Sequence, residues 1–154
     1  MSATHIRRRI DAPREVVYRA LLDPRAIPQW RVPDGMSCVV HEFYAREGGA
    51  FRVSLTYDSA DAAGKTASNT DTYHGRFVKL VLNEEVVERL EFETDDAALR
   101  GEMTITTRLV EVDGGTEVVA VHDGLPAGLS PADNETGWRM ALGRLAEYCE
   151  RRSS

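Results

Sequence analysis

The chain has 154 residues, of which 42% are hydrophobic, and this length and composition predict one globular domain that spans residues 1–154. Its 19 basic and 25 acidic residues leave a net charge of −6, which argues against nucleic acid or an anionic membrane surface as the main partner. The sequence has no apolar leader and no apolar run long enough to cross a membrane, so we expect no membrane insertion.

The N-terminal part combines one strand with short helices. Thr4–Ile10 alternates weakly between polar and apolar residues and predicts a strand. Proline suits the first turn of a helix, so we expect a helix over Pro13–Leu22. That helix must end before Pro24, because the residue preceding a proline is disfavoured in helical geometry. Pro24–Trp30 then predicts a second, shorter helical turn.

From Met36 onward the pattern indicates strands separated by turn residues. In the clearest of them, apolar Phe51, Val53, Leu55 and Tyr57 alternate with polar residues. The small, polar segment Asp58–Thr70 predicts a loop. The predicted strands are Met36–Tyr44, Phe51–Tyr57, Asp71–Leu82, Val86–Thr94, Leu99–Val112 and Thr116–Asp123.

A long amphipathic helix over Ser130–Arg151 ends the chain. Ser130 suits the N-cap and Pro131 the first helical position. Spacings of three and four residues form one apolar stripe, made of Trp138, Ala141, Leu142, Leu145, Ala146 and Cys149. Consecutive antiparallel strands pair with their neighbours, and this helix is long enough to cover the face of the sheet that they form. The sequence therefore predicts an α+β fold in which a curved antiparallel sheet surrounds the last helix.

Several segments carry a family resemblance through their order and spacing. They are IDAPREVVYRALLDPRAIPQW at residues 10–30, a Gly-Gly hairpin before an aromatic residue at 47–51, a Gly-containing strand and its successor at 73–90, a Gly-Thr strand at 115–125, and Gly137-Trp138 in the last helix. Together they resemble the activator of Hsp90 ATPase homologue C-terminal-like family of the START/Bet v 1-like (SRPBCC) superfamily. The resemblance implies a helix-grip fold, with about six or seven strands and one or two short helices after the first strand. It also implies a cavity between helix and sheet, but no shared catalytic residue.

Strand alternation and the helical stripe indicate which side chains would face that cavity. His122 stands out, because a histidine on an apolar face could orient a ligand or act as an acid or base. A core-edge histidine held by a backbone partner fits the same pattern, and His74 is a similar candidate. The candidate ligand-binding residues are Trp30, Phe51, Val53, Leu55, Tyr57, His74, Met103, Ile105, Val118, Ala120, His122, Trp138, Leu142 and Leu145.

Binding is the function that the sequence favours. It contains no metal-binding, nucleotide-binding or hydrolase motif, so we expect no metal and no cofactor. Cys38 and Cys149 form no CxxC motif and suit a reducing cytoplasm. We expect a hydrophobic small molecule or lipid as the ligand. A chaperone-regulator-like module that binds a chaperone partner, and a polyketide cyclase- or dehydratase-like enzyme that uses His122, stay open, as does a homodimer.

Overall fold

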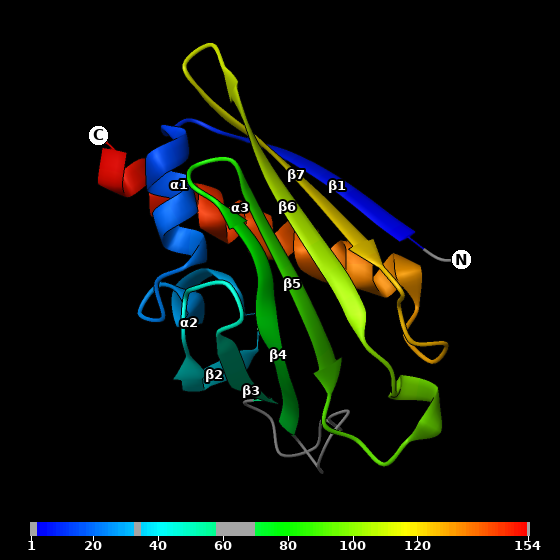
Figure 1. Ribbon diagram of the computed structural model, residues 1–154. Coiled ribbons are helices and arrows are strands. Elements are labelled where there is room, and N and C mark those ends of the chain that lie inside the picture. The colour runs from blue at the N-terminus through cyan, green and yellow to red at the C-terminus, as the bar shows by residue number, and fades with distance from the viewer. Residues whose placement is uncertain (1–2, 33–34, 58–69, 154) are drawn as a thin grey trace.

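In the computed structural model, which describes residues 3–32, 35–57 and 70–153, a seven-stranded antiparallel sheet curves around one long helix (Figure 1). The strands are β1 (Ala3–Ile10), β2 (Met36–Phe43), β3 (Ala50–Tyr57), β4 (Thr70–Val81), β5 (Glu85–Phe92), β6 (Met103–Val112) and β7 (Gly115–Asp123). The helices are α1 (Arg14–Leu21), α2 (Ile27–Trp30) and α3 (Pro131–Ser153), with a short 3-10 turn, η1 (Ala97–Leu99), before β6. The strand order β1-β7-β6-β5-β4-β3-β2 confirms the predicted meander and the helix-grip, α+β architecture.

The long helix α3 begins where its sequence predicts. The Ser130 hydroxyl accepts a hydrogen bond from the Asp133 amide at 3.3 Å, and the Ser130 carbonyl accepts one from the Asn134 amide at 2.9 Å. These bonds satisfy amides that have no partner within the helix itself. The predicted stripe packs into the core through Ala141, Leu142, Leu145, Ala146 and Cys149, which are all buried. The helix crosses the concave face of the sheet and packs on β1, α1 and α2 (Figure 1).

The two short helices are fastened to each other and to α3. The Trp30 indole N–H donates to the Ala20 carbonyl at 3.1 Å, so the end of α2 is tied to the end of α1 inside the core. The Trp30 ring also meets the Trp138 ring edge-on, with 6.3 Å between centroids. Just beyond α2, the Arg144 guanidinium donates to the Val32 carbonyl. The chain at Val32 is thereby held against α3.

Most predicted boundaries differ from the structure by at most two residues, and two differ by more. The strand expected from Leu99 begins instead at Met103, because Asp96 caps the η1 turn through a 2.9 Å bond from the Ala98 amide. The helix expected over Pro24–Trp30 is confined to α2. Of the loop expected over Asp58–Thr70, Thr70 belongs to β4 and the rest lies outside the described residues.

Candidate functional site

A cavity of about 520 Å³ lies between the N-terminal half of α3 and the sheet. Its walls come from the inward-facing residues of β2 to β6, the turn that leads into α3, and the first turns of α3. Most of the side chains that form them are apolar or aromatic. The lining residues are Arg31, Met36, Leu55, Tyr57, Asp71, Tyr73, Leu90, Phe92, Met103, Ile105, Gly128, Leu129, Ser130, Asp133, Asn134, Gly137, Trp138 and Ala141.

The structure brings only part of the predicted site to this cavity. Its walls include Leu55, Tyr57, Met103, Ile105 and Trp138. Most of the other predicted residues pack in the hydrophobic core outside the lining, namely Trp30, Phe51, Val53, Val118, Ala120, Leu142 and Leu145. The strand residues among them face the same side of the sheet, and on that side α3 packs against β1, α1 and α2.

His74 lies on the opposite face of the sheet from the cavity. It follows Tyr73, a lining residue, and successive side chains of a strand point to opposite faces. Its ring nitrogens lie 3.0 Å from Glu93 Oε2 and 3.2 Å from Glu91 Oε1. Glu93 also accepts a 2.8 Å bond from Arg52. His74 is therefore part of a polar network on the outer face and does not reach the cavity.

Sequence reasoning missed a buried ion pair at the cavity wall. Arg31 Nη1 donates to Glu88 Oε1 at 2.8 Å, and the two side chains are only 9% and 7% exposed. Burial by itself would lower the pKa of Arg31, but the adjacent Glu88 carboxylate more than offsets this and raises that pKa. The guanidinium therefore stays charged. One signal was available: Glu88 falls between Val86 and Leu90 on the apolar face of β5, where a charged residue needs a partner.

Two aromatic rings flank the Arg31 guanidinium. Its carbon lies 4.9 Å from the centre of the Trp138 ring and 5.4 Å from that of Tyr73. Both distances are within the range of cation–π attraction. Burial raises the pKa of Tyr73 to about 12, against the opposing influence of Arg31, so the phenol is neutral near pH 7. The wall here combines one cation with flat aromatic surfaces.

His122 lies behind the cavity wall and is fully buried. Burial, and then the charge of Arg31, lower the pKa of His122 to about 3, so the ring is neutral. Its Nδ1 lies 3.0 Å from Nδ2 of Asn134, a lining residue, and its ring meets Trp138 edge-on at 4.7 Å. Since the Asn134 amide donates to Nδ1, the imidazole proton is on Nε2, which has no hydrogen-bond partner among the described residues. His122 thus contacts the lining residues but does not itself line the cavity.

Both cysteines are free thiols with weak acidity. Burial raises the pKa of Cys38 to about 11, although the nearby Arg31 charge acts against this. Burial likewise raises the pKa of Cys149 to about 12. Since the thiolate is the reactive form of cysteine, neither side chain has the character of a nucleophile near neutral pH.

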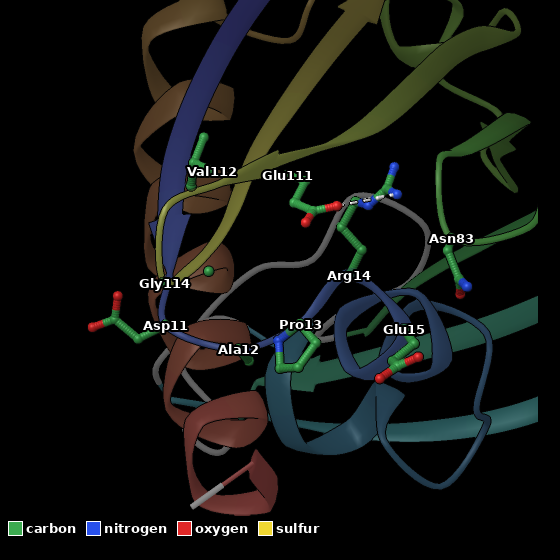
Figure 2. A pocket seen from close by; sticks show the side chains of 10 residues that line it. Asp11, Ala12, Pro13, Arg14, Glu15, Asn83, Glu111, Val112 and Gly114 are labelled. Atoms are coloured by element: carbon green, nitrogen blue, oxygen red, sulfur yellow. Dashed lines mark ion pairs between the residues drawn. The ribbon is translucent and has the colours of Figure 1, made fainter.

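A second pocket, of about 510 Å³, lies by the start of α1 and the turn between β6 and β7 (Figure 2). It is near the C-terminal end of α3, where the Asp11 amide donates to Glu150 at 3.0 Å. Figure 2 shows Arg14 and Glu111 facing each other, with 3.6 Å between Nη2 and Oε2. Four of its ten lining residues are charged, namely Asp11, Arg14, Glu15 and Glu111, and none is aromatic, so it lacks the mainly apolar walls expected of a small-molecule site.

Across residues 3–32, 35–57 and 70–153, no group of three His, Cys, Asp or Glu side chains is placed to hold a metal ion. No helix within the same ranges combines the length and apolar character needed to cross a membrane.

The comparisons with known proteins agree with the fold. The sequence model described as "Activator of Hsp90 ATPase homolog 1-like protein" matches residues 11–150. The chain belongs to this AHSA1 family. The predicted resemblance is therefore confirmed over nearly the whole AHSA1-like domain. No protein with a curated description matches the sequence significantly.

Solved structures share the AHSA1 fold along almost their entire length. A crystal structure of a protein from Chromobacterium violaceum is 32% identical in sequence, with a TM-score of 0.87 and 96% of each chain covered. A crystal structure from Rhodobacter sphaeroides is 21% identical, with a TM-score of 0.81 over 97% of this chain and 93% of that one. The solution structure of the AHSA1-like protein from Aeromonas hydrophila is 19% identical, with a TM-score of 0.74 over 98% of this chain and 94% of that one. The family match supports a ligand-binding or regulator-like module.

Proposed function

We propose that this AHSA1-like protein binds a small, mostly apolar molecule or lipid in the cavity beside α3. One observation carries the proposal: the cavity of about 520 Å³, bordered by apolar and aromatic side chains. Small-molecule sites in proteins are typically of roughly 300–1,000 Å³, with apolar walls and a few polar groups that orient the ligand. Arg31 and Asn134 are polar groups of that kind in this lining. A cytoplasmic location, which suits the free thiols, is part of the proposal.

The chemistry of the wall favours binding over catalysis. Tyr73 in the wall, and Cys38 near Arg31 outside the lining, stay protonated near neutral pH because burial raises the pKa of both groups. His122, the acid or base of a cyclase-like mechanism, lies behind Asn134 and Trp138, and burial lowers its pKa to about 3. A general base works best when its pKa is near the operating pH and it can reach the substrate proton. His122 has neither property in this arrangement.

Filling the cavity tests the proposal. Gly137 lines the cavity, and a Cβ built on it meets no atom within 4 Å, so Gly137→Leu would direct an isobutyl group into the open space. N-Phenyl-1-naphthylamine, a neutral probe that fluoresces in apolar surroundings, should bind the wild-type protein and raise its melting temperature. We expect Gly137→Leu to weaken that binding by roughly tenfold or more, because the added side chain occupies the site.

A matched control exists on the same helix. Gly143 also has open space around a built Cβ but does not line the cavity. Gly143→Leu should bind the probe as tightly as the wild-type protein does. Equal binding by all three proteins would place the probe elsewhere and contradict the proposal.

A chaperone-regulator-like module is the second candidate, favoured by the family match over residues 11–150. It predicts that the protein changes the ATPase rate of a purified Hsp90-type chaperone. If the regulatory surface is separate from the cavity, Gly137→Leu should keep that effect while losing the probe. An unchanged ATPase rate at saturating protein would remove this candidate.

A further inference from the structure

We propose that the cavity selects neutral ligands that carry a hydrogen-bond acceptor, such as a ketone or amide carbonyl, facing Arg31, and a hydroxyl or N–H donor facing Asn134. The inference rests on the proposed binding function and adds the polar pattern of the ligand to it. It is built on two lining side chains whose orientation is fixed by buried partners behind the wall.

Arg31 supplies the donor side. A guanidinium carries several N–H groups in one plane, and among the described residues only Glu88 accepts from it, through Nη1. The group is held between the Trp138 and Tyr73 rings, which both line the cavity. Its remaining N–H groups are therefore pre-positioned for an acceptor atom of a ligand that lies between these rings.

The charge of Glu88 decides which acceptor fits. Arg31 and Glu88 already form a neutral pair at 2.8 Å, and both side chains are largely buried. A ligand carboxylate at Arg31 would place a second negative charge beside Glu88 in a region with little water. Like charges that share such a site repel strongly, and burying an unmatched charge is costly. An uncharged carbonyl accepts the same hydrogen bonds without that cost.

Asn134 supplies the acceptor side. Asn134 Nδ2 donates a hydrogen bond to Nδ1 of neutral His122 at 3.0 Å. This bond fixes the orientation of the Asn134 amide. The carbonyl oxygen of the amide is then the atom left to accept from a ligand. His122 is fully buried and packed against Trp138, so it is a positioning residue for Asn134. The Trp138 ring contacts both Arg31 and His122, the partner of Asn134, so it links the two polar sides of the site.

Five probes with one diphenyl skeleton test the pattern. 4-Hydroxybenzophenone carries both polar groups, benzophenone only the carbonyl, 4-benzylphenol only the hydroxyl, and diphenylmethane neither. Diphenylacetate places a carboxylate where benzophenone has its carbonyl. Affinities come from displacement of N-phenyl-1-naphthylamine from the wild-type protein. We expect 4-hydroxybenzophenone to bind tightest, with each polar group worth about tenfold, and diphenylacetate to bind more weakly than benzophenone.

Variants assign each preference to its residue. Arg31→Met combined with Glu88→Gln removes the ion pair without leaving a buried charge, and it should abolish the preference for benzophenone over diphenylmethane. The preference for 4-benzylphenol over diphenylmethane should persist in this double variant and disappear in Asn134→Leu. Glu88→Gln alone should make diphenylacetate bind more tightly than benzophenone, because Arg31 would then lack its counter-ion.

The wild-type series alone can overturn the inference, whether or not every variant folds. Equal affinity for diphenylmethane and 4-hydroxybenzophenone would refute the polar pattern while leaving apolar binding intact. Tightest binding of diphenylacetate would refute the preference for neutral ligands. Failure of all five probes and of the naphthylamine would remove the proposed function together with the inference.

Discussion

Burial of His122 makes the stability of the protein depend on pH. Burial, and then the Arg31 charge, lower the pKa of His122 to about 3, against a weaker opposing effect of the Asn134 hydrogen bond. The unfolded chain, in which a histidine has a pKa of about 6.5, therefore takes up the proton first as the pH falls. The folded state is therefore favoured most above about pH 6.5, where His122 is neutral in both states. This advantage of the folded state is lost as the pH falls toward 3, because protonation of His122 stabilises the unfolded chain.

The expected effect is a loss of about 1.4 kcal/mol of unfolding free energy for each pH unit below about 6.5. Urea unfolding at pH 7, 6 and 5 measures it, and His122→Gln should show a shallower slope than the wild-type protein. His5, which is exposed on β1, gives the control for loss of a surface imidazole through His5→Gln. Identical slopes for the wild-type protein and His122→Gln would show that His122 already takes up a proton in the folded state.

Single residues differ in how far the sequence foretells their role. Leu55 and Tyr57 were expected at the cavity from strand alternation alone, and they line it. Asn134 could not be assigned, since its partner His122, on β7, becomes adjacent only when the chain folds. Arg31 lies in a proline-rich stretch with no periodic pattern, so the sequence around it does not indicate its role. Only Glu88, a charged residue on an apolar strand face, indicated that a cation was needed.

At the scale of elements, the contact between β4 and β5 depends on Gly75. A Cβ built at Gly75 would lie 2.0 Å from the Arg89 carbonyl oxygen and 2.8 Å from Leu90 Cα, and both of these atoms belong to the backbone of β5. Gly75→Ala must therefore push the two strands apart. We expect it to lower the free energy of unfolding by about 3 kcal/mol, as overpacking does in other cores.

Denaturant unfolding of Gly75→Ala measures this loss. Gly137→Ala is the opposite control, because its added methyl group meets open space and alanine is the better helix former. It should raise stability by up to about 1 kcal/mol. A Gly75→Ala protein as stable as the wild type would mean that β4 and β5 separate at little cost.

Elements were the easiest features to predict, because their signals are local. Ser130 and the apolar stripe mark the start and the buried face of α3 without any tertiary information. The predicted start of β6 was wrong because the Asp96 cap and Gly101, at a φ of +114°, favour a turn where hydrophobicity alone suggested a strand.

At the scale of the whole molecule, the fold has one solid end and one hollow end along α3. The C-terminal half of the helix is buried at Leu142, Leu145 and Cys149, and α3 packs against α1, α2 and β1. The N-terminal half borders the cavity through Asn134 and Trp138, which are only partly buried. Alternation along a strand, or an apolar stripe along a helix, identifies the side that faces inward but not which part of that side another element fills. For this reason the sequence pointed to Leu142 and Leu145, which the helix packs into the core.

This asymmetry predicts how a ligand changes local stability. Amides with few packing contacts open and exchange with solvent more readily than amides in the core. In the free protein, the amides of residues 135–138 should therefore exchange faster than those of residues 142–149. Saturation with 4-hydroxybenzophenone should slow exchange in the first set by mass action and leave the second nearly unchanged, as followed by hydrogen–deuterium exchange. In Gly137→Leu the same addition should change neither set. Protection spread evenly along α3 would instead indicate that the ligand stabilises the domain as one unit, and that the two ends of α3 do not open independently.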